Sequence, residues 1–449
     1  MSFKKDFMWG VSSAAYQVEG AYNEDGKGLG IWDALSESKG KVARGEAGNI
    51  ACDHYHLYKD DVKIMKELGL KHYRFSVSWS RVMPEGAGRV NEKGLEFYSN
   101  LLDELNAAKI EPMMTLYHWN MPYELYKKGG WLHEDSSEWF AEYTKVVVNA
   151  LGDKVRYWLT FNEPQIFTFL GYRVGIHAPF DHYTDEQFIA MTKNVLLAHG
   201  KAVKIIRDAL GDKALISFSP TGDCHIPENN TEKAIEKAYN KSLELGHNFM
   251  FSNTWWSDPV FFRKYADGAK ERFGDEMFKF TEEEFDLVSQ PLDFFAYNVY
   301  QSATEFRDGR EINEMYEYPG CPKTLSGWCV TPEVLYWTAK FWHKRYNLPV
   351  FITENGCALN DWVCLDGKVY DYQRIDFLTR YLRELKRAAD EGVDIWGYTH
   401  WSFTDNFEWA SGYEPRYGLV QGEVRTMERT IKESGFWYKK VIETNGDNL

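Results

Sequence analysis

The chain has 449 residues, with 52 Lys and Arg against 67 Asp and Glu, and so carries a net charge of −15. This charge repels phosphate backbones and anionic lipids, so neither nucleic acid nor a membrane surface is an expected partner. Aromatic residues make up 16% of the chain, which excludes a disordered protein and leaves many rings to place in a core or a site.

Apolar runs alternate with helical patterns along the chain. Eight runs have the length and the β-branched or aromatic content of buried strands, at residues 7–13, 72–77, 112–117, 155–161, 214–219, 293–299, 350–353 and 394–400. Stretches with helical spacing lie between them, for example residues 56–69, 94–109, 138–151 and 376–392. This alternation predicts a single-domain parallel (β/α)8 TIM barrel over residues 1–449, although length alone suggests about three domains.

An open, doubly wound sheet is the alternative architecture. Such sheets often carry a Gly-rich phosphate-binding fingerprint after the first strand, whereas the first predicted strand here runs into SSAAYQVEG at residues 12–20. The segment GKGLG at residues 26–30 lacks the spacing of a Walker motif and follows no predicted strand directly. We interpret it as a loop and expect no nucleotide site there.

Polar and aromatic residues recur at the ends of the predicted strands, where closed barrels carry their chemistry. In chain order they are Gln17, Glu19, Arg74, His118, Asn162, Glu163, Asn298, Tyr300, Glu354 and Trp401. Glu163 and Glu354 alone would each be more typical of a turn, because NEP and ENG are common turn sequences. Together they place two carboxylates across a barrel mouth, the minimum for cleaving a glycosidic bond, with one as acid and the other as nucleophile or base.

Six motifs occur in order along the chain, at strand ends and in the segment after the last strand: FMWGVSSAAYQVEGA, YRFSVSWSRVMPEG, LYHW, LTFNEP, FITENG and WSFTDNFEWASGYEPRYGL. With these motifs the chain resembles the family 1 glycoside hydrolases, the retaining β-glucosidases and their relatives. The resemblance extends from about residue 7 to residue 442. It implies a (β/α)8 barrel, in agreement with the independent count of strands.

The resemblance also implies roles for individual residues. Glu163 matches the acid/base and Glu354 the nucleophile of the family. The residues that match those holding the sugar hydroxyls are Gln17, His118, Asn162, Glu408 and Trp409, and Trp401 matches the ring beneath the sugar. The groups expected around the nucleophile are Arg74, Asn298 and Tyr300, and Trp328 is the candidate platform for the leaving group.

Physical chemistry gives the two carboxyls different requirements. Glu354 must be ionised, and a guanidinium at Arg74 with the Tyr300 hydroxyl would favour that form. Glu163 must begin protonated, so a neighbouring negative charge and partial desolvation should raise its pKa. Retention requires the carboxyls to lie about 5 Å apart, against about 6.5–9.5 Å for inversion. Since no sequence contains that distance, retention follows here from the resemblance.

The family pattern is kept at some positions and changed at others. Relatives acting on 6-phosphorylated sugars lack the Glu408-Trp409 pair, so we expect an unphosphorylated substrate. Thioglucosidase relatives lack the acid, so the presence of Glu163 indicates O-glycosides. Asn120 replaces the usual Asp after His118, and Gln165 replaces a frequent Trp, which removes a possible platform on the leaving-group side. Val299 breaks the usual NYY motif while the two matching functional positions are kept.

The expected function is therefore that of a retaining exo-β-glycosidase. It would release terminal non-reducing β-D-glucosyl residues, and β-D-galactosyl or β-D-fucosyl residues, from β-O-glycosides such as cello-oligosaccharides through a covalent intermediate. One alternative is a transglycosylase that passes the same intermediate to another hydroxyl group. The other is an inactive sugar-binding relative, which would be expected to have lost Glu163, Glu354 or Arg74.

Localisation and cofactors are predicted from what the chain lacks. It has no stretch of 18 apolar residues, and its start, MSFKKDFMWG, lacks the apolar segment of a secretory signal, so we expect no membrane span and a cytoplasmic location. Six cysteines without a CxxC motif predict reduced thiols. His54 and His56 have the spacing of metal ligands but no third ligand pattern, so neither a metal nor another cofactor is expected. The oligomeric state stays open.

Overall fold

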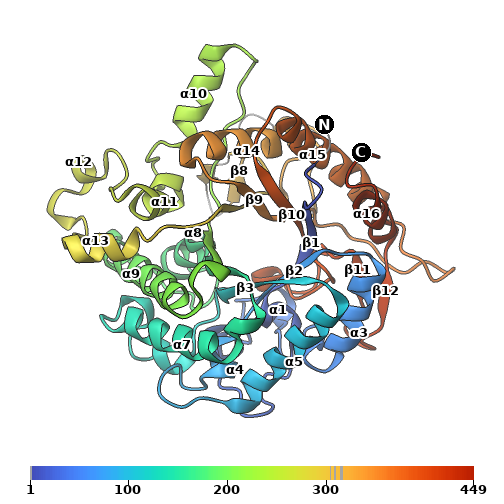
Figure 1. Cartoon of the computed structure of the whole chain (residues 1–449), viewed down its shortest axis with the longest axis horizontal. Helices are drawn as coiled ribbons and strands as arrows, with labels where there is room; N and C mark the ends of the chain where they lie inside the picture. The colour runs from blue at the N-terminus through green and yellow to red at the C-terminus, as the bar shows by residue number, and fades with distance from the viewer. Residues whose placement is uncertain (1–2, 304, 308–309, 314–316) are drawn as a thin grey trace.

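The computed structural model describes residues 3–303, 305–307, 310–313 and 317–449. Eight parallel strands form its central sheet (Figure 1). They are β1 (Met8–Ser12), β2 (His72–Ser76), β3 (Glu111–Tyr117), β4 (Tyr157–Asn162), β5 (Leu215–Ser219), β6 (Phe295–Asn298), β9 (Val350–Asn355) and β10 (Ile395–Trp401). Each of the eight predicted strands is present, and the predicted (β/α)8 barrel is confirmed.

The sheet curls into a nearly closed barrel. Its strand order is β5-β4-β3-β2-β1-β10-β9-β6, so β5 and β6 are the two strands that must meet. They are joined at the start of β6, where Asp293 N–H donates to the Ile216 carbonyl at 3.0 Å and Asp293 Oδ2 accepts from Ile216 N–H at 2.7 Å. A third bond, from Asn298 N–H to the Pro220 carbonyl at 3.0 Å, joins the other ends of these strands.

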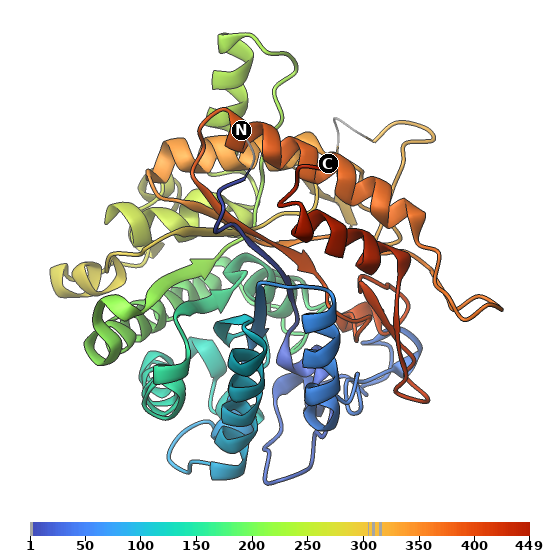
Figure 2. The same cartoon turned by 45° about the vertical axis from the view of Figure 1, so that its right-hand side comes forward.

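Helices surround the strands (Figures 1 and 2). The longer ones are α3 (His54–Glu67), α5 (Glu92–Ala108), α7 (Ser136–Leu151), α9 (Asp185–Leu210), α10 (Glu232–Ser242), α11 (Asn253–Phe262), α14 (Glu333–Tyr346), α15 (Tyr372–Asp390) and α16 (Glu433–Glu443). The shorter ones are α1 (Ala15–Val18), α2 (Ile31–Leu35), α4 (Trp79–Val82), α6 (Tyr123–Tyr126), α8 (Pro164–Thr168), α12 (Ala269–Phe273) and α13 (Glu282–Val288). Helix α10 projects from the body of the molecule in both views.

The amphipathic pattern of the helices explains how they cover the barrel. In α15 the buried side chains recur every three or four residues, at Phe377, Leu378, Tyr381, Leu382, Leu385 and Ala388. The strands therefore contact an apolar helix face while the opposite face meets water. Two antiparallel hairpins, β7 (Glu305–Arg307) with β8 (Arg310–Ile312) and β11 (Val420–Gly422) with β12 (Arg429–Ile431), lie outside the barrel. Among the described helices, none is both long and apolar enough to span a bilayer.

The interior of the barrel is divided into an apolar and a polar layer. The apolar layer contains Met113, Tyr157, Leu159, Phe294, Ala296 and Phe351, near the starts of their strands. The polar layer lies toward the strand ends and contains Arg74, Thr115, Asn162, Ser219, Asn298 and Thr353, all of them buried. The apolar layer is thus the floor on which the polar side chains at the strand ends are assembled.

Candidate active site

An extra residue in β9 turns the Glu354 side chain into the barrel. Tyr297 of β6 pairs with Ile352 and Asn298 pairs with Glu354, so one step along β6 matches two steps along β9. The pairing of β10 with β9 is shifted in the same region. Since Phe351 faces the interior, regular alternation would point Thr353 inward and Glu354 outward. The β-bulge lets both face the interior.

A second bulge lies in β4, the strand that precedes Glu163. Leu159 pairs with Ser217 and Asn162 with Ser219, so β4 has one residue more than β5 over this step. Its effect is to bring Asn162 to the interior. The chain then turns sharply at Glu163, whose φ of 43° lies in the left-handed region, and α8 begins at the following proline. Glu163 N–H donates to the Ser219 carbonyl at 2.7 Å, which anchors this turn to β5.

Glu354 is held by a cation and a phenol. Arg74 Nη1 donates to Glu354 Oε1 at 2.5 Å, and the Tyr300 hydroxyl donates to Oε2 at 2.7 Å. Arg74 is 1% exposed and Glu354 4%, so both charges are removed from water. This burial raises the pKa of the Glu354 carboxyl, while Arg74 and Tyr300 act in the opposite direction by favouring the carboxylate. Arg74 is therefore the group that compensates the buried negative charge.

Asn298 connects the two glutamates through a network in which its amide has a fixed orientation. Its Oδ1 accepts hydrogen bonds from the hydroxyls of Ser219 (2.8 Å) and Thr353 (2.7 Å). Its Nδ2 must therefore be the donor, to Asn162 Oδ1 at 2.9 Å and to Glu163 Oε1 at 2.8 Å. Asn162 Oδ1 also accepts from Arg74 Nη2 at 2.5 Å. The two glutamates and the side chains that bind them thus form one connected set.

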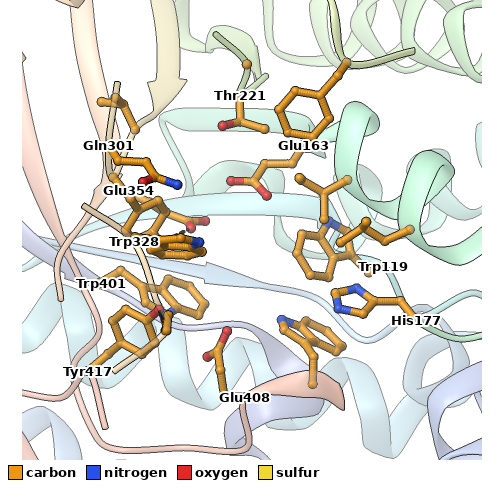
Figure 3. A pocket seen from close by; sticks show the side chains of 18 of the residues that line it. Trp119, Glu163, His177, Thr221, Gln301, Trp328, Glu354, Trp401, Glu408 and Tyr417 are labelled. Atoms are coloured by element: carbon orange, nitrogen blue, oxygen red, sulfur yellow. Dashed lines mark hydrogen bonds between the residues drawn. The ribbon is translucent and has the colours of Figure 1, made fainter. Parts of the chain in front are cut away.

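Both glutamates point into one cavity of about 260 Å³ at the ends of the strands (Figure 3). Of the residues predicted from the sequence, the cavity wall contains Glu163, Glu354, His118, Tyr300, Trp328, Trp401, Glu408 and Trp409. The other four, Gln17, Arg74, Asn162 and Asn298, lie directly behind that wall and are at most 1% exposed. The structure therefore brings all twelve residues together: eight line the cavity and four lie behind them.

One end of the cavity is formed by Glu408 and aromatic rings. His118 lies between two indoles, with its ring centroid 5.9 Å from that of Trp401 and 5.9 Å from that of Trp409. Burial raises the pKa of Glu408 to about 8, with a smaller contribution from the charge of Glu354, and hydrogen bonds from Gln17 and Trp401 oppose both. Burial also lowers the pKa of His118 well below its usual value, so its ring is neutral.

Gln17 is bound to the segment that carries Glu408. Its Nε2 lies 2.9 Å from the Phe407 carbonyl oxygen and 3.2 Å from Glu408 Oε2. Its Oε1 is buried and has no hydrogen-bond partner among the described residues. A buried acceptor without a partner is costly unless a ligand or water supplies the donor. Gln17 therefore offers one free acceptor at this end of the site.

The other half of the cavity is formed by loops. Trp328 packs against Tyr300, with ring centroids 5.0 Å apart, and lies 6.3 Å from the ring of Tyr417. Wall residues that were not among the twelve predicted side chains include Trp119, Ile166, Leu170, His177, Thr221, Gly222, Asp223, Phe251, Gln301, Ser302, Ser326, Ser411 and Tyr417. Thr221 and Gln301 follow β5 and β6, and Trp119, Ser411 and Tyr417 lie within two of the six motifs, so usable signals existed for them. His177 comes from a segment where no sequence signal pointed to the site.

The structure explains two of the departures from the family pattern. Gln165 does not line the cavity; it is fully buried, and its Nε2 donates to the Thr221 carbonyl at 2.6 Å while Thr221 N–H lies 3.4 Å from its Oε1. Its amide therefore ties α8 to the loop after β5. Asn120 Oδ1 accepts from Trp32 N–H at 3.0 Å, and its Nδ2 faces Asp33 Oδ2 at 3.3 Å, a donor role that an aspartate could not fill.

The two histidines with metal-like spacing have separate partners. His54 is buried with Nδ1 2.7 Å from Asp61 Oδ2, whereas His56 is exposed and bonds Asp53 and Glu24. Within the described part of the chain, His, Cys, Asp and Glu side chains form no group of three that could hold a metal ion.

Comparison with known proteins gives a consistent assignment. A family model described as glycosyl hydrolase family 1 matches residues 1–447. The chain is 43% identical to β-glucosidase A of Acetivibrio thermocellus and 38% identical to the 1,4-β-D-glucan glucohydrolase of Thermotoga neapolitana, each alignment covering 99% of both chains. A solved structure of the Thermotoga maritima β-glucosidase with galacto-hydroximolactam matches with a TM-score of 0.90 at 36% identity over 99% of both chains. The chain therefore belongs to glycosyl hydrolase family 1.

Proposed function

We propose that this family 1 enzyme is a retaining exo-β-glucosidase that acts on unphosphorylated β-O-glucosides. The observation that carries the proposal is the pair of buried glutamates in one cavity, with Glu354 held by Arg74 and Tyr300 and Glu163 bound to Asn298. Arg74 and Tyr300 thus favour the Glu354 carboxylate against the cost of its burial, and Glu163 has the position of a proton donor.

In the first step, Glu354 attacks the anomeric carbon while Glu163 protonates the glycosidic oxygen. The bond to the leaving group breaks, an ester forms between the sugar and Glu354, and the Glu163 proton leaves with the aglycone. Arg74 and Tyr300 hold the Glu354 carboxylate in place for this attack, since each donates to a different oxygen. Asn298 orients Glu163 through its donor Nδ2.

In the second step, Glu163 acts as a base toward water. Once Glu354 is esterified, its negative charge is gone, which lowers the pKa of Glu163 and favours its ionised form. Water loses a proton to Glu163, attacks the anomeric carbon and releases Glu354 as a carboxylate, so the configuration is retained overall. The transglycosylation alternative differs only in the acceptor, because a sugar hydroxyl takes the place of water.

Recognition of the terminal sugar would take place at the end formed by Glu408. Indole rings of Trp401 and Trp409 suit the apolar faces of a pyranose, and Gln17, His118 and Glu408 suit its hydroxyl edges. Glu408 offers a phosphate no positive charge, and no Lys or Arg lies in the described wall of the cavity, so a sugar phosphate would be buried there without a cation. Activity toward β-galactosides and β-fucosides, and a preference for cello-oligosaccharides, belong to this proposal. So does a cytoplasmic location.

The test replaces the nucleophile. Glu354→Gly should reduce hydrolysis of p-nitrophenyl β-glucoside to background, because no ester can form. Azide should restore turnover and give the α-glucosyl azide, since the small anion fills the space of the missing carboxylate. Gly356, two residues away, cannot serve as a control because it packs against the Trp401 carbonyl, so the unmodified enzyme with azide is the reference. Unchanged hydrolysis by the variant would refute the proposal.

A substrate panel tests the finer points. The unmodified enzyme should cleave p-nitrophenyl β-glucoside and cellobiose, and should cleave the 6-phosphorylated glucoside far more slowly. Equal rates on the phosphorylated substrate would contradict the role given to Glu408. Product analysis at high cellobiose concentration separates hydrolysis from transglycosylation, and p-nitrophenyl β-galactoside and β-fucoside measure the breadth of sugar recognition.

A further inference from the structure

Trp328 lies on a short hairpin at the mouth of the cavity. Lys323 and Cys329 pair in antiparallel fashion, and the turn is closed by bonds from Thr324 N–H to the Trp328 carbonyl and from Gly327 N–H to the Thr324 carbonyl, both 2.9 Å. Gly327 has a φ of 82°, which suits glycine in this turn. The indole is therefore carried by the returning arm of a loop and not by a barrel strand.

Contacts attach this hairpin to the barrel at its tip and its base. At the tip, Leu325 N–H donates to the Ala358 carbonyl at 2.9 Å and the Ser326 hydroxyl lies 2.6 Å from the Tyr417 hydroxyl. At the base, the Thr331 hydroxyl accepts from Ser302 N–H at 2.8 Å. These bonds locate the hairpin as a whole but lie two or more residues from Trp328.

Of the described bonds that join the hairpin to the barrel, the one nearest to Trp328 along the chain is made by Gln301. Cys329 N–H, one residue beyond Trp328, donates to Gln301 Oε1 at 3.0 Å. Cys329 is 3% exposed, so water cannot replace this acceptor without a shift of the hairpin. Gln301 itself lines the cavity, next to Tyr300, on the side that holds Trp328 and Glu354 (Figure 3).

We propose that Gln301 is a positioning residue that sets the preference for the leaving group by holding Trp328 in place. The inference rests on the proposed function, in which Trp328 is the platform for the leaving group. Gln301 lies in the loop after β6, between Tyr300, whose carbonyl accepts from the Tyr381 hydroxyl at 3.1 Å, and Ser302, whose N–H donates to Thr331. Its amide reaches from this anchored segment across to the arm that carries the indole. A loop residue thereby acquires a fixed position relative to Glu354 without belonging to a strand.

The experiment compares two substrates that share the sugar and differ in the leaving group. Cellobiose presents a second glucose to Trp328, whereas β-glucosyl fluoride presents only a fluorine atom. Gln301→Met keeps the side-chain length and removes the amide acceptor. It should lower kcat/KM for cellobiose about fivefold, mainly through KM, as expected for the loss of one neutral hydrogen bond, and leave glucosyl fluoride unchanged.

Gln301→Glu supplies the rescue, because a carboxylate can still accept from Cys329 N–H. It should restore most of the cellobiose activity when each enzyme is assayed at its own pH optimum, which allows for a shift of the pH profile by the added charge. Gln290→Met is the matched control, since Gln290, on the segment after α13, does not line the cavity and donates to the Asp286 carbonyl. This variant should change kcat/KM for neither substrate. Thermal unfolding of each variant checks that the fold is kept.

A double-mutant cycle shows whether Gln301 acts through Trp328. Trp328→Ala should weaken cellobiose cleavage relative to glucosyl fluoride, and adding Gln301→Met to it should cause no further loss. Additive losses, or equal losses on both substrates for Gln301→Met, would overturn the proposal. If Trp328→Ala leaves the ratio of kcat/KM for the two substrates unchanged, Trp328 is not the platform for the leaving group, and the role proposed for Gln301 is refuted as well. If Trp328→Ala changes the ratio and Gln301→Met does not, the positioning role alone is refuted.

Discussion

The two halves of the cavity are built in different ways. In the inner half, Arg74, Asn162, Asn298 and Glu354 lie on barrel strands, are at most 4% exposed and are joined by bonds between side chains. In the outer half, Thr221, Gln301 and Trp328 lie on loops, and each joining bond pairs a glutamine amide with a main-chain group.

The difference assigns separate tasks to the two halves. Strand-borne side chains that are bonded to one another share their positions, so a change in one disturbs them all. Loop residues that are held through the main chain can be exchanged with little effect on the strands. We therefore expect changes of Arg74, Asn162, Asn298 or Glu354 in the inner half to affect every substrate, and changes in the outer half to affect substrates according to their leaving group. Glu163 is the exception in the inner half, because the acid that we propose it to be acts on the leaving group itself.

The largest effect is expected for Glu163→Ala. Glu163 lies in the inner half, but the loss of activity in this variant should depend on the leaving group of the substrate. Cellobiose, whose leaving group needs a proton, should lose about 10²–10⁴-fold in kcat/KM. A 2,4-dinitrophenyl β-glucoside, whose leaving group needs none, should lose far less in the first step. The comparison requires steady-state kinetics on both substrates. Equal losses would show that Glu163 is not the acid.

An intermediate effect is expected for Glu408→Gln, measured as the dependence of the protein's stability on pH. Burial raises the pKa of Glu408 to about 8 in the folded protein, above that of an unfolded glutamate. Between the two values the folded state binds a proton that the unfolded state has lost, so stability falls as pH rises toward 8. Glutamine resembles the neutral carboxyl, so the variant should not lose this stability as the pH rises.

The variant should therefore have the higher melting temperature near pH 8, and the gap to the unmodified enzyme should close near pH 4. Melting curves at half-unit pH intervals measure the gap. A gap that does not depend on pH would mean that Glu408 is ionised in the folded protein throughout.

The smallest effect is expected for Gln165→Leu, in the outer half. Leucine cannot bond the Thr221 main chain, so the loop after β5 should lose its link to α8. We expect about a fivefold lower kcat/KM for cellobiose and no change for β-glucosyl fluoride. Equal losses on both substrates would place Gln165 with the inner half, because the change would then have reached Glu163 through α8.

The periodicity of the chain was sufficient to predict the eight strands and their order. Apolar content and length identify buried strands because each must pack on both faces. One boundary error falls at the site itself: the seventh run was expected to end at residue 353, and β9 extends to Asn355. The charged Glu354 ends the apolar run in the sequence, whereas the bulge keeps this residue in the strand with its side chain turned inward.

The motifs likewise identified the side chains at the strand ends, since chemistry requires particular residue types there. They did not single out Gln301, which lies outside every motif, or Tyr417, which lies within the sixth motif. Position 165, considered from the sequence as the place of a possible platform, does not line the cavity. A glutamine that pairs with main chain has no signature in sequence, because the partner is any N–H or carbonyl that the fold brings near.

Local order and residue chemistry are thus encoded along the chain: strands, helices, the two glutamates and the family to which they point. The closure of β5 on β6, the bulges that turn Asn162 and Glu354 inward, and the raised pKa of Glu408 arise only in the folded barrel. The physical reason is that each depends on residues far apart in sequence, as Arg74 and Glu354 are, and on a burial that no short segment can produce alone.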